Sequence, residues 1–273
     1  MSATQAACIL SFPSNPRKCG ESLKFDVRSR KNCVEGGRWK WYNTRPMNPI
    51  YFVAGIDTGI GKTIATGLMA KSLRARGADA ITVKLVQTGN DGFSEDIEAH
   101  RRICGCGSLP EDEAGLTAPQ IFKFPSSPKL AAELEGRTVD LNRIRECVDE
   151  CAKRRSPVLV EAAGGLHVPL KDSVLTIDFA AERGWPVVLV TCGRLGSINH
   201  TLLSLDAIRS RGMKLAGIVY NWHPDADPQI DHDTPETILD YLGRWGFPSR
   251  IVRIPRVPDG GPYPDIDFSE IFQ

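Results

Sequence analysis

The sequence contains no apolar run that could cross a lipid bilayer. One of its longest runs, Pro186–Val190, is far shorter than the roughly 20 residues that a membrane-spanning helix requires. An excess of charge is also missing, because 34 Lys and Arg residues nearly balance 33 Asp and Glu residues, for a formal net charge of +1. A surface that binds nucleic acid normally carries a positive excess. The composition therefore predicts neither a membrane nor a nucleic-acid partner and favours small-molecule partners.

A disulfide framework and a disordered composition are absent as well. Apolar residues make up 41% of the chain and charged residues 25%, which is typical of globular proteins. The eight cysteines are scattered over 273 residues, a usage that indicates reduced thiols in a cytoplasmic protein. Cys104 and Cys106 form one close pair and Cys147 and Cys151 another, but neither spacing matches a zinc-binding motif elsewhere in the chain. No structural zinc site is therefore expected.

Charge is distributed unevenly along the chain. Residues 1–46 hold nine Lys and Arg residues against three Asp and Glu residues, whereas residues 47–273 hold 25 and 30. The first segment also lacks a clear helical or strand period. We interpret residues 1–46 as a basic extension that is disordered or dispensable, with Met47 as the functional start. An organellar targeting segment is the alternative interpretation.

Residues 47–273 alternate short apolar runs with amphipathic stretches, and no Pro, Gly or Ser-rich linker divides them. This pattern predicts a single α/β domain, a three-layer fold in which helices flank a mainly parallel sheet. Strands are expected at Ile50–Ala54, Ala80–Leu85, Val158–Glu161, Val187–Thr191, Leu215–Tyr220 and Ile251–Ile254. Helices are expected at Lys62–Arg76, Glu95–Cys104, Pro128–Glu135, Leu141–Arg154, Val174–Glu182, Ile198–Arg211 and Pro235–Trp245.

The strongest local signal is the segment Gly55–Thr63, which lies between a predicted strand and a predicted helix. It resembles the pattern GxxxxGK[ST], with five residues instead of four between its first glycine and Gly61. Its glycines allow backbone N–H groups to turn toward phosphate oxygens. Lys62 can reach the β- and γ-phosphates, and the Thr63 hydroxyl is a Mg²⁺ ligand of the expected kind. The motif predicts a nucleoside triphosphate site. Its predicted nucleotide-binding residues are Gly59, Ile60, Gly61, Lys62, Thr63 and Ile64.

Three charged residues lie at or after strands that approach the same edge of the predicted sheet. Lys84 ends the second strand, and a second cation there would stabilise charge on a transferring phosphoryl group. Asp96 and Glu161 are carboxylates that, together with Thr63, would complete a Mg²⁺ site. The simpler interpretation of Lys84 is a solvated residue at a strand end.

Four segments of the chain together resemble the dethiobiotin synthetase family. They are Gly55–Thr63, Lys84–Gly89, Val160–Leu170 and Leu195–Leu203, and the resemblance extends over about residues 48–256. It implies a P-loop homodimer that closes the ureido ring of dethiobiotin from 7,8-diaminononanoate, CO2 and MgATP. On this resemblance, the reaction runs through a carbamate and a carbamic-phosphoric anhydride, and it yields ADP and phosphate.

The resemblance also implies roles for individual residues. Lys62 and Lys84 would flank the reacting phosphoryl and carbamate oxygens, while Thr58 and Thr88 would donate hydrogen bonds near the substrate. The implied Mg²⁺ ligands are Thr63, Asp96 and Glu161. The implied residues of the adenine pocket are Asn221 and Pro255. The implied substrate-binding residues are Gly164 and Gly165 at the diamine, and Ser197, Ile198 and Asn199, which would receive the distal carboxylate from the neighbouring subunit.

Three other kinds of protein that carry a phosphate-binding motif remain open at this point. A partitioning-type ATPase usually carries a second lysine early in the loop, where this chain has Ile56. An amidotransferase-related ATPase requires a further glutaminase domain, for which this length leaves little room. A nucleotide-binding module without catalysis would have no need of Lys84, Asp96 and Glu161 around the phosphates.

Overall fold

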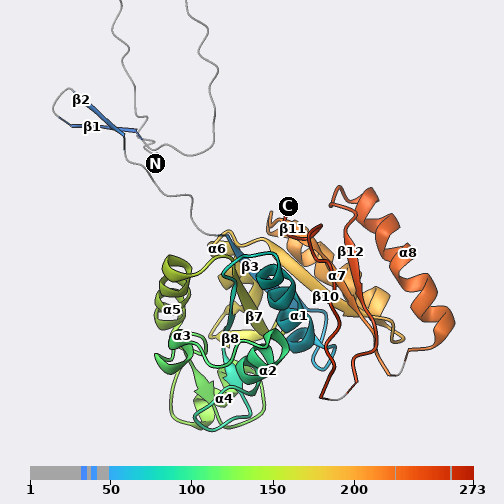
Figure 1. Ribbon diagram of the computed structural model, residues 1–273, viewed down its shortest axis with the longest axis horizontal. Coiled ribbons are helices and arrows are strands. Elements are labelled where there is room, and N and C mark those ends of the chain that lie inside the picture. The colour runs from blue at the N-terminus through green and yellow to red at the C-terminus, as the bar shows by residue number, and fades with distance from the viewer. Residues whose placement is uncertain (1–31, 36–37, 42–48, 225, 259) are drawn as a thin grey trace, which may run out of the picture. The chain divides into compact units, whose positions relative to one another are not determined.

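The computed structural model describes residues 32–35, 38–41, 49–224, 226–258 and 260–273 of the chain, which divides into two compact units, Met1–Pro46 and Met47–Gln273. In the first unit, β1 (Asn32–Glu35) pairs antiparallel with β2 (Arg38–Trp41) (Figure 1). The sequence pattern predicted no strand there, because runs of four residues show no clear period. The Gly-Gly pair between them is nevertheless a hairpin signal. The rest of the predicted extension lies outside the described residues.

The second unit is built on a six-stranded sheet in which every neighbouring pair of strands is parallel. The strand order is β12-β11-β10-β3-β7-β4. The strand bounds are β3 (Ile50–Gly55), β4 (Ile81–Lys84), β7 (Val158–Gly165), β10 (Val187–Cys192), β11 (Leu215–Asn221) and β12 (Ile251–Ile254). The central strands are almost fully buried, as expected of a parallel sheet covered on both faces.

Helices cover both faces of this sheet (Figure 1). Helices α1 (Lys62–Ala75) and α2 (Glu95–Cys104) pack on one face, and α5 (Leu141–Arg154), α6 (Thr176–Glu182), α7 (Ser197–Ser210) and α8 (Pro228–Arg244) pack on the other. The short helices are α3 (Pro110–Glu113) and α4 (Pro128–Leu134). The predicted three-layer α/β fold is confirmed. Among the described residues, no helix combines the length and the apolar character needed to span a bilayer.

Helix α8 begins seven residues before its predicted start. The prediction placed the start at Pro235 because proline lacks the N–H that continues a helix and is favoured in a first turn. In the structure, Asp227 caps α8, and Pro235 lies inside it. The carbonyl of Asp231 therefore has no helical donor, but it accepts hydrogen bonds from Arg253 Nη2 at 3.0 Å and Tyr220 Oη at 3.3 Å. Tertiary hydrogen bonds thus replace the missing helical one.

The remaining differences involve very short elements. Helix α6 begins at Thr176 rather than Val174, because β9 (Val174–Leu175) pairs with β8 (Pro169–Lys171). The parallel pair β5 (Gln87–Thr88) and β6 (Ile121–Phe122) was not predicted either. Segments of two to four residues show no measurable hydrophobic period, so the sequence pattern does not reveal them.

Deletion of residues 1–46 tests whether the first unit is dispensable. The second unit has its own sheet and core, so the truncated chain should keep its melting temperature and its specific activity within about twofold. Thermal unfolding and turnover of the full-length and truncated proteins provide the measurement. A large drop in melting temperature would show that residues 1–46 stabilise the second unit.

Candidate active site

The phosphate-binding loop connects the end of β3 to the start of α1. Gly61 is the N-cap of α1 and has φ = +85°, a conformation that glycine adopts at little cost. A Cβ atom at this position would lie 1.8 Å from Nδ2 of Asn221. Asn221 ends β11 and donates a hydrogen bond to the carbonyl of Ile60 at 3.0 Å. The loop and the predicted adenine-binding residue are therefore in direct contact, and Gly61 permits this contact.

A cavity of about 790 Å³ opens in front of this loop, at the carboxyl ends of β3, β4 and β7. Such edges are where open α/β sheets place their ligands. The predicted residues that line it are Thr58, Gly59, Gly61, Lys62, Thr63, Ile64, Lys84, Thr88, Asp96, Glu161 and Gly164. Three separate strand ends and the first turns of α1 and α2 therefore contribute to one site.

A buried cation lies between two carboxylates in this cavity. Nζ of Lys84 is 2.6 Å from Oδ2 of Asp96 and 2.8 Å from Oε1 of Glu161. The Lys84 side chain is 8% exposed, and that of Glu161 is fully buried. Burial alone lowers the pKa of Lys84, but the two carboxylates outweigh it and raise the pKa. Burial raises the pKa of Glu161, and the opposing effects of Lys84 and His100 hold it well below its usual range. Lys84 and Glu161 therefore stay charged at neutral pH.

Two residues of the loop extend this cluster. Oγ1 of Thr63 lies 2.5 Å from Oδ1 of Asp96 and 3.3 Å from Oε1 of Glu161, so one hydroxyl and two carboxylates converge. Lys62 donates a hydrogen bond from Nζ to the carbonyl of Asp57 at 2.8 Å. Burial and the nearby Lys84 lower the pKa of Lys62 to about 8. An anionic ligand would therefore reduce the electrostatic repulsion between the ammonium groups of Lys62 and Lys84.

Helix α2 brings Asp96 to the cluster because its first turn is fixed in place. Oγ of the N-cap residue Ser94 accepts a hydrogen bond from the backbone N–H of Ile97 and lies 2.6 Å from Oε1 of Gln87, to which it donates. Gln87 belongs to β5, directly after the strand that carries Lys84. The helix start is thus tied to the strand end, and Asp96 faces Lys84.

Sequence reasoning missed a histidine at this site. Nε2 of His100 is 2.8 Å from Oε2 of Glu161, and Nδ1 is 3.1 Å from Oγ1 of Thr82. All three side chains are fully buried. The available signal was spacing, since Asp96 and His100 are four residues apart on a predicted helix and therefore share one face.

The other predicted residues lie outside the cavity. Ser197 is buried, and its hydroxyl is 3.4 Å from Sγ of Cys192, whereas Ile198 is half-buried and Asn199 is exposed at the start of α7. Pro255 is exposed after β12. Gly165 lines a smaller cavity of about 300 Å³, which Thr58 also lines and which reaches His200 of α7. Thr58 is therefore common to the two cavities.

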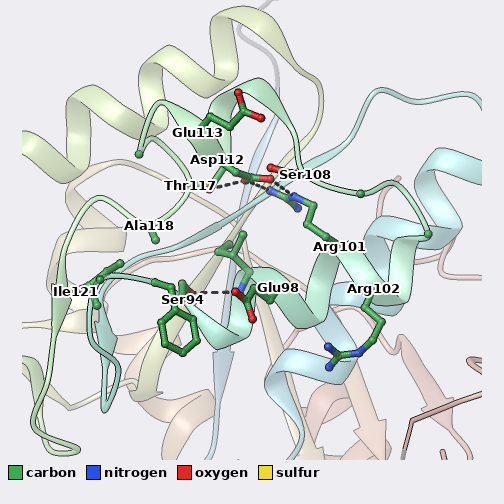
Figure 2. Close-up of a pocket in the computed structure, with 16 residues that line it drawn as sticks. Ser94, Glu98, Arg101, Arg102, Ser108, Asp112, Glu113, Thr117, Ala118 and Ile121 are labelled. Atoms are coloured by element: carbon green, nitrogen blue, oxygen red, sulfur yellow. Dashed lines mark hydrogen bonds and ion pairs between the residues drawn. The ribbon is translucent and has the colours of Figure 1, made fainter.

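A further cavity of about 600 Å³ lies on the outer side of α2 (Figure 2). Its charged wall is an ion pair in which Arg101 donates to Asp112 from Nε at 2.8 Å and from Nη2 at 2.7 Å. The hydroxyl of Thr117 donates to the same carboxylate at 2.6 Å. This cavity is lined by residues 92–121 and by no residue of the phosphate-binding loop.

The parallel sheet, the strand-loop-helix around Lys62 and the buried Lys84 cluster define a P-loop ATP-binding enzyme. The profile of the AAA domain family matches residues 50–261. The chain is 44% identical to the ATP-dependent dethiobiotin synthetase BioD 2 of Pasteurella multocida, over 73% of this chain and 93% of the relative. It is 47% identical to the ATP-dependent dethiobiotin synthetase BioD of Chlorobaculum tepidum, over 71% and 82%.

The chain belongs to the ATP-dependent dethiobiotin synthetase family and is an ATP-dependent cyclo-ligase of biotin biosynthesis. The predicted family and enzyme class are therefore confirmed. Among solved structures, the chain is similar to a ParA family ATPase from Chlorobium tepidum TLS. That similarity has a TM-score of 0.46 and 15% identity, and it covers 78% of this chain and 86% of the other.

Substitution of Gly61 tests whether the close contact with Asn221 shapes the nucleotide site. Gly61→Ala places a methyl group within 1.8 Å of Asn221 Nδ2, so ATP affinity should fall at least about tenfold as the loop shifts. Gly77→Ala is the matched control, because Gly77 has the same φ of +85° but a Cβ atom added to it would meet nothing within 4 Å. Calorimetric titration with ATP provides the measurement. Equal ATP affinities in the two variants would show that the contact with Asn221 does not shape the nucleotide site.

Proposed function

We propose that the enzyme forms dethiobiotin from 7,8-diaminononanoate and CO2 at the expense of ATP. One observation carries this proposal: the ammonium group of Lys84 is buried beside the phosphate-binding loop and held by two carboxylates at 2.6 and 2.8 Å. A solvated lysine at a strand end would not need such partners. A fixed cation at this position suits a reaction in which negative charge passes between a carboxylate-like group and a phosphoryl group.

The proposed chemistry has three steps. One amine of the substrate captures CO2 as a carbamate, and a carbamate oxygen attacks the γ-phosphorus of ATP and releases ADP. The second amine then displaces phosphate from the carbamic-phosphoric anhydride, and the ureido ring closes. The protein supplies position and charge rather than a covalent intermediate. Lys62 faces the nucleotide phosphates, Lys84 faces the transferring group, and the hydroxyls of Thr58 and Thr88 orient the substrate.

Mg²⁺ fits the donor set of the cavity. The hydroxyl of Thr63 lies within hydrogen-bonding distance of the carboxylates of both Asp96 and Glu161, and oxygen ligands are those that Mg²⁺ prefers. When bound, Mg²⁺ would neutralise charge on the triphosphate. We propose these three residues as the groups that hold it. In this structure Lys84 forms an ion pair with both carboxylates.

Two regions beside the phosphate-binding loop suit different parts of the ligands. Asn221 is hydrogen-bonded to the loop at Ile60, and we propose that it reads the adenine beside Pro255. Gly164 has φ = +71°, and a Cβ atom there would lie 2.9 Å from Val168 and 3.7 Å from the Thr58 hydroxyl. Gly164 lines the main cavity and Gly165 the smaller one, and Thr58 lines both, so we propose that the diamine binds beside these two glycines.

We propose a homodimer in which the start of α7 serves the site of the partner subunit. Ser197, Ile198 and Asn199 lie outside the main cavity of their own chain, so they do not complete the site as it stands. Large apolar side chains are exposed in and just before the same helix, with Leu195 83% and Leu203 61% exposed. A second copy of the chain would cover them. The N–H groups at a helix start suit the distal carboxylate of the substrate.

The compartment is also part of the proposal. The described cysteines, Cys104, Cys106, Cys147, Cys151 and Cys192, are free thiols. Reduced cysteines are typical of proteins in the cytoplasm. We therefore propose that the enzyme acts there.

Product analysis tests the reaction directly. The protein is incubated with 7,8-diaminononanoate, bicarbonate and MgATP, and ADP and the cyclic urea are measured by mass. We expect one ADP for each urea formed, and little ADP without the diamine. ADP released at the same rate without diamine, and with no cyclic urea, would contradict the proposal and favour a simple ATPase.

Mixed dimers test the shared site. Lys84→Ala removes the central cation, and Asn199→Asp places a negative charge where the substrate carboxylate is proposed to bind, so each variant alone should be inactive. In a mixed dimer, one site keeps both native residues if α7 acts on the partner subunit. Random re-association in equal amounts should then restore roughly a quarter of the wild-type activity. No recovery would show that each chain builds its site alone.

A further inference from the structure

His100 is a buried titratable residue that the proposed chemistry does not use. It lies on α2 one turn after Asp96, and its ring is fully buried between Glu161 and Thr82. Thr82 in turn accepts a hydrogen bond from Nη1 of Arg101 at 2.8 Å. Four side chains thus form a continuous line that ends on the carboxylate proposed to face the nucleotide.

The direction of each hydrogen bond follows from the chemistry of its partners. A guanidinium group only donates, so Thr82 Oγ1 must accept from Arg101. An ionised carboxylate only accepts, so the Nε2 of His100 must carry the hydrogen that bonds Glu161. The Thr82 hydroxyl carries a single hydrogen, and beside a neutral His100 ring this hydrogen is donated to Nδ1. Every donor in the line points toward Glu161.

This arrangement leaves none of these buried atoms without a partner. Among the described residues, the buried polar side-chain atoms that lack a hydrogen bond are Nε of Arg145, Nε of Arg183 and Oγ1 of Thr234, none of which belongs to the line. The alternative tautomer, with the hydrogen on Nδ1, would place a bare nitrogen against the carboxylate. A buried pair of acceptors is costly, so the protein selects the Nε2–H form.

The outer end of the line is fixed at the cavity beside α2 (Figure 2). Asp112 receives two hydrogen bonds from Arg101, one from Thr117 and one from the backbone N–H of Leu109 at 2.8 Å. Burial raises the pKa of Asp112, but these hydrogen bonds outweigh it and lower the pKa. Asp112 therefore remains an anion that aims the guanidinium group at Thr82.

We propose that His100 is a positioning residue that fixes the orientation of the Glu161 carboxylate. Its ring binds Oε2 and leaves Oε1 for Lys84 and Thr63. Thr82 and Arg101 hold the ring in the tautomer that this task requires. The inference rests on the proposed function, in which Glu161 holds Mg²⁺ beside the triphosphate. Partners behind a metal-binding residue of this kind typically change metal affinity by about 10- to 100-fold when they are removed.

The tautomer is measured without substrate or metal. Nitrogen-15 NMR of the histidine-labelled full-length protein should show His100 with hydrogen on Nε2 and an unprotonated Nδ1, and the signal should disappear in His100→Gln. Thr82→Val, which keeps the shape but removes the hydroxyl, should shift the Nδ1 resonance, whereas Thr82→Ser should not. A ring with hydrogen on Nδ1 and none on Nε2 would overturn the inference.

Two substitutions of His100 then separate positioning from packing. His100→Leu removes the donor, whereas the amide of His100→Gln can still donate to Oε2. Calorimetric titration of Mg²⁺ into each protein saturated with a non-hydrolysable ATP analogue should show affinity lowered about tenfold or more in His100→Leu and restored to within about threefold in His100→Gln. Equal Mg²⁺ affinity in His100→Leu and the wild type would overturn the inference, whatever the change in melting temperature.

The outcomes also separate this inference from the proposed function. If the wild type forms no cyclic urea, the proposed function fails, while the tautomer and the Mg²⁺ affinities are still measured. If the wild type forms it and His100→Leu binds Mg²⁺ normally, only the inference fails. Should His100→Leu not fold, Thr82→Val and Thr82→Ser give the same comparison, with weaker Mg²⁺ binding expected only in the valine variant.

Discussion

The buried ion cluster of Lys84 with Asp96 and Glu161 is the constraint on which the rest of the site depends. A charge removed from water must be paired, and removing one partner from a buried pair usually destabilises a protein by about 3–5 kcal/mol. Lys84 and Glu161 are register partners on neighbouring parallel strands, so the sheet itself brings them together. Asp96 arrives from α2, whose start is tied to the same strand end through Ser94 and Gln87. The strand register and the start of α2 therefore determine where the three charged side chains of the site lie.

A second constraint acts at the phosphate-binding loop, and it is steric rather than electrostatic. Asn221 approaches the phosphate-binding loop so closely that only glycine fits at position 61. One hydrogen bond, from Asn221 to Ile60, joins the ends of β11 and of the loop after β3. The carboxyl edge of the sheet therefore holds two preformed regions, one around the ammonium of Lys84 and one around the loop, with the cavity between them.

The residues with the clearest sequence signals were those fixed by backbone topology. The sequence motif identifies Lys62, and the predicted strands place Lys84 and Glu161 at strand ends. Because parallel strands end at one edge of a sheet, the convergence of these three residues was predictable. His100 was missed because its partner Glu161 is 61 residues away, and the spacing of His100 from Asp96 places it on the same helix face without identifying that partner. The predicted start of α8 was wrong because hydrogen bonds from Arg253 and Tyr220 replace the one lost at Pro235. These two residues come near the helix only in the folded chain.

The central claim is that Lys84 acts on the transferring group, whereas Lys62 acts on the nucleotide. The most direct measurement compares ATP affinity and turnover in Lys84→Ala and Lys62→Ala, with Lys153→Ala as an exposed control on α5. The account predicts that Lys84→Ala keeps ATP affinity within about threefold while turnover falls by about 10²–10³, and that Lys62→Ala loses both. Wild-type turnover in Lys84→Ala would contradict it.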